Sequence, residues 1–309
     1  MTEATSTPLA TEPAAAVRWS HRIEAWGAAL FFAAMRALPL DIASATGGTL
    51  ARWIGPRLGV SNRARRNLRA ALPELSAARI EAIVRGMWDN LGRVAAEYPH
   101  LRHIRVFPPD GRVETLGIEH LDRALAAGHP VILFGGHLGN WEVAALAAGQ
   151  YGLDIAQIYR AANNPLVDRM ITRLRGAKDS SGTGEFIAKG AIASRRAVGA
   201  LRRGAHLALL ADQKLNDGIA APFFGRPAMT APALGLLALR FDCTVLPTRV
   251  ERLQGARFRL TLYPPIEVPR SGNRDANVAA LMTAVNATLE GWIRERPEQW
   301  FWVHNRWPD

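Results

Sequence analysis

Short apolar runs alternate with helical segments after Pro130, and this alternation constrains the fold more than any other feature. The runs that predict strands are "PVILFGG", "LDIAQIYR", "HLALLADQ", "CTVLPTRV" and "FRLTLYPPIE". Two segments with helical patterns, "GAIASRRAVGALRRG" and "APALGLLALRF", lie between them. Residues 131–134 and 207–210 carry no polar side chain, as expected for strands that helices cover on both faces. The pattern predicts an α/β fold with a mainly parallel central sheet flanked by helices.

Longer helices are expected on either side of this region. The stretch "SAARIEAIVRGMWDNLGRVAAEY" repeats apolar residues at helical spacing, and Ser76 is suited to its N-cap. A second long helix, "ANVAALMTAVNATLEGWIRERP", precedes the aromatic tail. Since 309 residues with 49% hydrophobic content can bury a large core, we expect residues 61–309 to form a single α/β domain.

The N-terminal part has a different character. Residues 1–20 are rich in Ala, Thr and Pro and lack the pattern of a secretory signal, so we expect disorder there. The pattern of residues 21–60 predicts a helical, membrane-associated extension. Its uncharged segment 25–35 falls short of the roughly 20 residues that cross a bilayer. Trp26, Leu30 and Trp53 suit a helix lying in the membrane interface, but a helix docked on the protein's own core fits equally well.

The charge balance indicates anionic partners. The chain has 38 Lys and Arg against 27 Asp and Glu, a formal net charge of +11. Nucleic acid, an anionic membrane face and an acidic carrier protein would all be attracted. A nucleic-acid-binding protein is the weaker interpretation, because we find no zinc-ligand spacing, RNA-binding motif or basic helix interleaved with aromatics. The single cysteine, Cys243, lies in an apolar run and is expected to be buried, which is compatible with a reducing compartment.

The stretch "GGHLGNWE" follows the first predicted strand. Functional groups gather at the carboxyl ends of strands in α/β sheets, and His137 and Glu142 stand five positions apart there. Residues five apart point about 140° away from each other on a helix, so the two meet only if His137 precedes a helix that Glu142 begins. Glu142 would then hold one imidazole nitrogen and leave the other as a general base. A turn with incidental polar residues is the alternative, and a metal-dependent hydrolase lacks a convincing third ligand.

Five motifs make the prediction more specific. They are "GGHLGNWE", "YRAANNPLVDRMITRLR", "KGAI...ALRRGAHLALLADQ", "APFFGRPAMTAPALGLLAL" and "RPEQWFWVHNRWP". Their order and spacing resemble the lipid A late acyltransferases, the lauroyl and myristoyl transferases of Gram-negative bacteria. The resemblance covers about residues 20–309 and implies transfer of a fatty acyl chain from acyl carrier protein to a hydroxyl of a lipid A precursor of the Kdo-lipid IVA type. It also implies a site at the cytoplasmic face of the inner membrane and no cofactor or metal. A related acyltransferase acylates phosphatidylinositol mannosides, which leaves another acceptor open.

The resemblance also implies roles for particular residues. His137 matches the general base and Glu142 its partner. Arg175 matches an arginine implicated in catalysis or substrate positioning, although Arg173 lies close enough to leave the choice open. Arg160 and Asp212 match further polar positions at strand ends; a carboxylate directly after "LALLA" has no role in core packing.

Other candidates follow from the chemistry of the reaction. Attack of a hydroxyl on a thioester needs a base and stabilisation of an oxyanion, and the motifs offer no obvious Ser or Cys nucleophile, so we expect direct transfer. The N–H groups of Gly135 and Gly136 are candidate oxyanion donors. Phe223, Phe224 and Gly225 form a loop that either lines an acyl channel or packs on the core. Trp300, Trp302 and Trp307 of the tail fit either an interfacial anchor or burial against the sheet.

Overall fold

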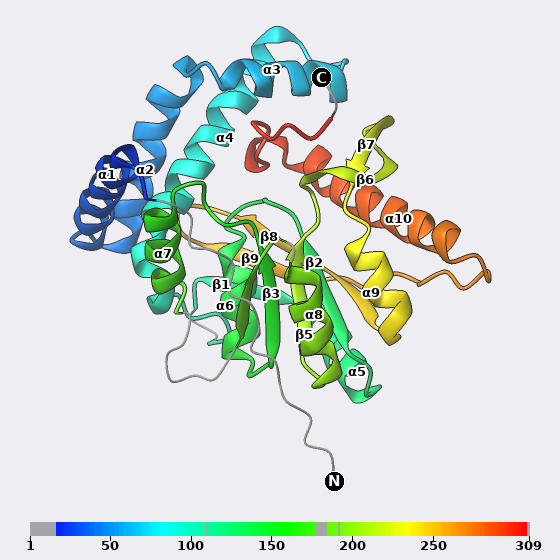
Figure 1. Ribbon diagram of the computed structural model, residues 1–309. Coiled ribbons are helices and arrows are strands. Elements are labelled where there is room, and N and C mark those ends of the chain that lie inside the picture. Colours follow the sequence, from blue (N-terminus) through cyan, green and yellow to red (C-terminus); the bar gives the residue numbers. More distant parts are fainter. Residues whose placement is uncertain (1–16, 109–110, 177–183, 191, 308–309) are drawn as a thin grey trace.

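The structure is a computed structural model that describes residues 17–108, 111–176, 184–190 and 192–307. Most of the segment 1–20, which the sequence predicts to be disordered, lies outside the described residues. Figure 1 shows a central sheet with helices packed around it, α1 and α2 on one side and α9 and α10 on the other.

The sheet has seven strands in the order β1-β9-β8-β2-β5-β3-β4. Every neighbouring pair is parallel except β8 and β9, which confirms the mainly parallel sheet. The strand bounds are β1 Val113–Leu116, β2 Val131–Gly135, β3 Ile155–Tyr159, β4 Glu185–Ala188, β5 His206–Leu210, β8 Thr244–Arg252 and β9 Phe258–Leu262. The five strands expected from apolar runs are present. The sequence pattern missed β1 and β4, the two edge strands, because an edge strand is short and carries no continuous apolar run.

Alternate residues of each central strand pack into two different cores. In β2, Ile132 and Phe134 contact one hydrophobic cluster, whereas Val131 and Leu133 contact the other. The first cluster is covered by helices α8 (Ala193–Arg202), α9 (Ala233–Phe241) and α10 (Arg274–Glu295). The second is covered by α5 (Ile118–Ala126) and α6 (Glu142–Gln150). Cys243 is buried in the first cluster, as predicted.

The N-terminal part and the connections are helical. Their elements are α1 Trp19–Arg36, α2 Leu40–Ile54, η1 Gly55–Arg57, α3 Ser61–Ala71, α4 Ala77–Glu97, η2 Tyr98–His103 and α7 Pro165–Leu174. The predicted N-cap of α4 is confirmed, since the Ser76 side chain accepts a hydrogen bond from the Arg79 N–H. None of the described helices combines the length and the apolar character needed to cross a membrane.

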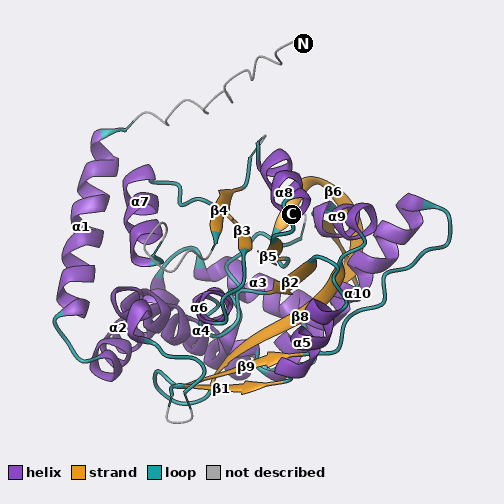
Figure 2. Cartoon of the chain, turned by 90° about the horizontal axis from the view of Figure 1, so that it is seen from below, coloured by secondary structure: helices purple, strands orange, loops and turns teal. Residues whose placement is uncertain are grey.

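Helices α1 and α2 have one packed face and one exposed apolar face. Phe31 and Leu38 pack against the buried side chains of Met35 and Ala96. The two helices stand at the edge of the molecule in both views (Figures 1 and 2), and their opposite face is exposed. Its exposed apolar residues are Trp19, Ile23, Trp26, Leu30, Ile42, Leu50, Trp53 and Ile54. Docking on the protein's own core therefore accounts for one face of these helices, and the interfacial interpretation concerns only the other.

The aromatic tail packs against a separate hairpin formed by β6 (Lys214–Phe223) and β7 (Arg226–Thr230). Its two-residue turn, Phe224-Gly225, has positive φ at both positions. Phe223 stacks on Trp307 and meets Trp300 edge to face. A final 3-10 turn, η3 (Pro297–Gln299), leads into this tail. Trp300, Trp302 and Trp307 are all buried, so of the two interpretations of the tail the structure favours packing over an interfacial anchor.

Candidate active site

The register of two neighbouring strands brings His137 and Asp212 together. Gly135 of β2 pairs with Leu210 of β5 in the parallel ladder. His137 and Asp212 each follow two residues later, at the carboxyl ends of their strands. A Cβ atom on Gly136 would lie 3.3 Å from an Asp212 carboxylate oxygen, so a glycine gives this exit the space it needs. The meeting of these two side chains is thus a consequence of strand order.

Asp212 holds the imidazole of His137 through two contacts. Its Oδ1 lies 2.8 Å from His137 Nδ1, and its Oδ2 accepts the His137 backbone N–H at 2.7 Å. The indole N–H of Trp300 donates to the same Oδ2 at 2.7 Å. Burial by itself would raise the pKa of Asp212, but the charge and hydrogen bonds of His137 outweigh it and hold that pKa far below its usual range.

This arrangement fixes the tautomer of His137. An ionised carboxylate can only accept hydrogen bonds, so in the neutral imidazole Nδ1 carries the proton and Nε2 keeps its lone pair. The His137 side chain is 15% exposed, whereas that of Asp212 is fully buried. The side-chain amide of Gln213 comes to 3.5 Å from Nε2, on the side of the ring that a substrate hydroxyl would approach. The pair therefore has the geometry of a general base with its orienting acid.

Glu142 begins helix α6, as the sequence predicts, but it binds Arg175. The Nε and Nη2 atoms of Arg175 contact its two oxygens at 2.8 and 2.6 Å. The hydroxyl of Tyr98 donates to Oε1 at 2.7 Å. Burial opposes ionisation of Glu142, yet the charge and hydrogen bonds of Arg175 dominate and lower its pKa.

The carboxylate partner of His137 is thus Asp212 and not Glu142, which corrects the pairing expected from the sequence. Trp141 links Glu142 to the base, because its indole N–H donates to Oε1 at 2.9 Å and its ring lies edge-on to the imidazole at 5.0 Å. The two carboxylates have different partners: Glu142 pairs with Arg175, whereas Asp212 accepts hydrogen bonds from His137 and Trp300. A catalytic contribution of Glu142 stays a prediction.

A second histidine, His304, flanks the imidazole of His137. The two ring centroids are 5.0 Å apart, and His304 Nε2 is buried without a hydrogen-bond partner in the described part of the chain. Burial lowers the pKa of His304 to about 3, so its imidazole is neutral near pH 7. Together with His137 and Asp212 it supplies three potential metal-ligand atoms within 4.8 Å of one another. This set does not include Glu142, so it differs from the His137–Glu142 metal site considered from the sequence, and both Asp212 oxygens are already engaged by N–H donors.

Comparison with known proteins identifies the family. Residues 12–309 match the family described as bacterial lipid A biosynthesis acyltransferase. The chain belongs to this family. It is similar to the lipid A biosynthesis acyltransferase of Haemophilus influenzae, with 23% identity over 92% of this chain and 89% of the relative. The lipid A biosynthesis palmitoleoyltransferase of Escherichia coli is 27% identical over 82% of this chain and 83% of its own length.

Another relative has a different acceptor in its name. The phosphatidylinositol mannoside acyltransferase of Mycobacterium tuberculosis is 26% identical over 91% of this chain and 88% of its own length. These relatives are all named acyltransferases. As a member of the same family, this protein is an O-acyltransferase.

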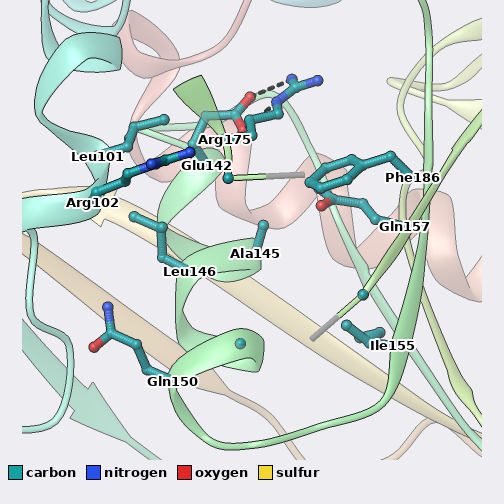
Figure 3. Close-up of a pocket in the computed structure, with 13 residues that line it drawn as sticks. Leu101, Arg102, Glu142, Ala145, Leu146, Gln150, Ile155, Gln157, Arg175 and Phe186 are labelled. Carbon is teal, nitrogen blue, oxygen red and sulfur yellow. Dashed lines mark hydrogen bonds and ion pairs between the residues drawn. The ribbon is translucent and has the colours of Figure 1, made fainter. Parts of the chain in front are cut away.

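A pocket of about 320 Å³ lies beside the Glu142–Arg175 ion pair. Figure 3 shows the ion pair at one end and apolar side chains from η2, α6, β3 and β4 around it. Leu101, Leu146, Ile155 and Phe186 form much of the apolar lining. This volume and lining are in the range of small-molecule sites, which typically span about 300–1,000 Å³.

The remaining predicted residues fall in different places. Arg175 is the arginine at the ion pair, while Arg173 is exposed. Arg160 follows β3 on the surface, and its charge helps to lower the pKa of His304 after burial and His137. The Gly135 carbonyl accepts a hydrogen bond from the Ala211 N–H within the sheet; an oxyanion role for Gly135 or for Gly136 stays a prediction.

The substrate loop expected at 223–225 lies in the hairpin turn. Phe223 is fully buried and Phe224 is 5% exposed, both among tail tryptophans, which favours core packing. Gly225 is exposed at the tip.

Sequence reasoning missed Tyr98, Trp300 and His304 as members of the site. Tyr98 directly follows helix α4 as the first residue of η2, more than forty positions from Glu142. Trp300 and His304 belong to the tail motif "RPEQWFWVHNRWP", so their place in a family motif was the available signal. The tail reaches the site because Trp300 forms an isolated antiparallel bridge with Leu138.

Proposed function

We propose that this protein transfers a fatty acyl chain from acyl carrier protein to a hydroxyl of a lipid A precursor of the Kdo-lipid IVA type. The observation that carries the mechanism is the 2.8 Å contact between His137 Nδ1 and Asp212 Oδ1 in a member of this family. His137 Nε2 takes the proton of the acceptor hydroxyl, and the oxygen attacks the thioester carbonyl carbon. The carbon–sulfur bond then breaks, and the imidazolium returns the proton to the thiolate.

This direct transfer needs no covalent enzyme intermediate and no metal. Asp212 stabilises the imidazolium that forms in the transition state. Backbone N–H groups at the turn after β2, near Gly136, are candidates to stabilise the oxyanion. In this proposal Glu142 and Arg175 support the wall of the site through Trp141, and Asp212 takes the role of orienting the base.

A second acceptor keeps the same chemistry. The similarity to the phosphatidylinositol mannoside acyltransferase covers 91% of the chain, against 92% and 82% for the two lipid A enzymes. A purified-enzyme assay that offers both acceptors with one acyl carrier protein thioester decides between them. Transfer to the mannoside alone would exclude the lipid A precursor as acceptor.

The pocket in Figure 3 is the candidate site for the acyl chain, because it combines apolar walls with a charged end near the base. Leu146 faces this pocket from α6. Replacing it with tryptophan fills part of the volume. We expect Leu146→Trp to reduce transfer of longer chains more than of shorter ones, measured with a series of acyl thioesters. An unchanged chain preference would place the acyl chain elsewhere.

The location that goes with this reaction is the cytoplasmic face of the inner membrane. The exposed apolar face of α1 and α2 would lie in the interface, and Arg22, Arg36 and Arg52 are exposed on the same two helices. The net charge of +11 would favour an acidic carrier protein and an anionic lipid alike.

The decisive experiment is mass spectrometry of lipid A from a deletion strain complemented with the wild type or with His137→Ala. We expect deletion to remove one acyl chain, the wild type to restore it and His137→Ala to leave it absent. An unchanged acyl pattern on deletion would contradict the proposal. In the purified system, we expect dialysis against a chelator to leave activity unchanged; loss of activity that zinc restores would favour a metal at His137, Asp212 and His304 instead.

A further inference from the structure

A buried polar cluster lies directly behind the loop 137–142. It consists of Asn90, Glu97 and Arg252, here called the clamp, and their exposed fractions are 6%, 0% and 7%. None of the three belongs to the five motifs that carry the family resemblance, although Asn90 and Glu97 lie in the helix predicted from residue 76 onward. Asn90 and Glu97 lie on α4, and Arg252 is the last residue of β8.

The carboxylate of Glu97 is saturated with donors. Arg252 contributes Nη1 at 2.5 Å to Oε1 and Nη2 at 3.0 Å to Oε2. Ser44 of α2 donates to Oε1 at 2.6 Å. The side-chain amide of Asn140, in the loop, donates to Oε2 at 2.8 Å. A carboxylate offers about four acceptor sites, so these contacts fix its orientation completely.

Asn90 holds the preceding loop residue. It stands seven positions before Glu97, two helical turns away on the same face of α4. Its amide donates to the backbone carbonyl of Gly139 at 2.9 Å. Arg252 Nε donates to its side-chain carbonyl at 2.8 Å. The guanidinium thus joins both α4 side chains into one unit.

The clamp therefore holds two consecutive residues between His137 and Glu142. Asn140 passes the constraint on, because its side-chain oxygen accepts the backbone N–H of Glu142 at 3.2 Å, where α6 begins. A buried ion pair is usually no more stabilising than apolar residues of the same volume, but it demands one geometry. We propose that Asn90, Glu97 and Arg252 are positioning residues that hold the loop 137–142 so that His137 meets Asp212 and the substrate hydroxyl. This inference rests on the proposed function.

The test separates position from stability. Glu97→Gln leaves the buried Arg252 charge uncompensated and should lower both Tm and kcat. In the double variant Glu97→Gln/Arg252→Met that charge is absent, so Tm recovers. We expect kcat, normalised to folded protein by circular dichroism, to stay about 10–100-fold below wild type in both variants, because a misplacement of about 1 Å can cost about 100-fold. KM for both substrates should change little.

The pH profile of kcat/KM distinguishes a positioning role from a purely structural one, which would leave this profile unchanged. If the loop shifts, His137 loses its alignment with Asp212 and the apparent pKa in kcat/KM changes. Recovery of kcat together with Tm in the double variant, with a wild-type pH profile, would overturn the inference. If neither variant folds, Asn90→Ala decides, since it removes the contact with Gly139 and keeps the ion pair.

A matched control lies on the same strand. Arg249 of β8 is also buried and pairs with Glu295 of α10 at 2.6 Å, away from the loop. Glu295→Gln should therefore retain wild-type kcat. Absence of transfer by the wild type in this assay would count against the proposed function, whereas an active wild type with unaffected clamp variants would count against the clamp alone.

Discussion

At the scale of single residues, the partner of His137 decides the chemistry. Asp212 stays ionised because the hydrogen bonds and charge of His137 outweigh its burial. Glu142 stays ionised for a different reason, because the positive charge and hydrogen bonds of Arg175 lower its pKa despite its burial. Glu142 and Asp212 are both buried carboxylates within family motifs and look equivalent in the sequence, but of the two only Asp212 contacts the imidazole.

Replacing Asp212 tests this assignment. Asp212→Asn keeps the shape but presents an amide to Nδ1, which allows the wrong tautomer of His137. We expect kcat to fall by about 10²–10⁴-fold, as for loss of general-base catalysis. Steady-state assays of Asp212→Asn beside Glu142→Gln provide the comparison. A smaller effect for Asp212→Asn than for Glu142→Gln would return the orienting role to Glu142.

His304 gives the protein a pH-dependent stability. Its pKa in the folded state is lowered to about 3 from the ordinary 6.5, so the unfolded chain binds the proton first as the pH falls. Stability is therefore lost below about pH 6.5, by about 2 kcal/mol at about pH 5. We expect His304→Leu to remove this part of the acid sensitivity in urea denaturation at about pH 7.5 and pH 5. The exposed His103, changed in the same way, is the control; an equal effect there would contradict the assignment.

At the scale of elements, α4 organises the N-terminal side of the site. It carries Asn90 and Glu97, it is followed directly by Tyr98, which contacts Glu142, and it crosses α2 at close range. The close crossing depends on glycine, since a Cβ on Gly47 would lie 2.4 Å from the Gly92 carbonyl oxygen.

Two glycine substitutions distinguish the effect of this close crossing on the free energy of unfolding from the effect of helix propensity. Gly47→Ala should lower the free energy of unfolding by about 1–3 kcal/mol, because the helices must move apart. Gly27→Ala on α1 meets nothing within 4 Å and should raise it by about 0.5–1 kcal/mol through helix propensity. Thermal or urea unfolding of the two variants measures both signs. A stabilised Gly47→Ala would show that α2 and α4 can separate freely.

At the scale of the whole molecule, the exposed apolar face of α1 and α2 stands at the end opposite α9 and α10 (Figure 2). Trp19, Trp26 and Trp53 are each more than two thirds exposed on it. Contiguous exposed apolar patches are typical of interaction surfaces, which is the basis of the following prediction.

We expect the wild type to bind vesicles with anionic lipid and to release them as salt is raised. The triple change Trp19→Ala/Trp26→Ala/Trp53→Ala should weaken sedimentation with such vesicles by at least about tenfold, because aromatic rings contribute most of the interfacial anchoring. Leu253→Ala removes an exposed apolar side chain elsewhere and should have no effect. Undiminished binding of the triple variant would exclude this face as the membrane contact.

The sequence by itself determined the local features. Apolar runs gave the buried strands, helical spacing gave α4 and α10, and the position of "GGHLGNWE" after a strand placed His137 before a helix that Glu142 begins. The five motifs indicated the acyltransferase family, which the match over residues 12–309 confirms.

Only the tertiary structure decided which groups meet. Asp212 reaches His137 because β2 and β5 are neighbours in register, and periodicity along a chain carries no information about strand order. Arg175 reaches Glu142 from 33 residues away, and His304 arrives from the tail because its tryptophans pack on the β6–β7 hairpin. Hydrophobic patterning is local, whereas the pairing of buried charges depends on how the whole chain packs.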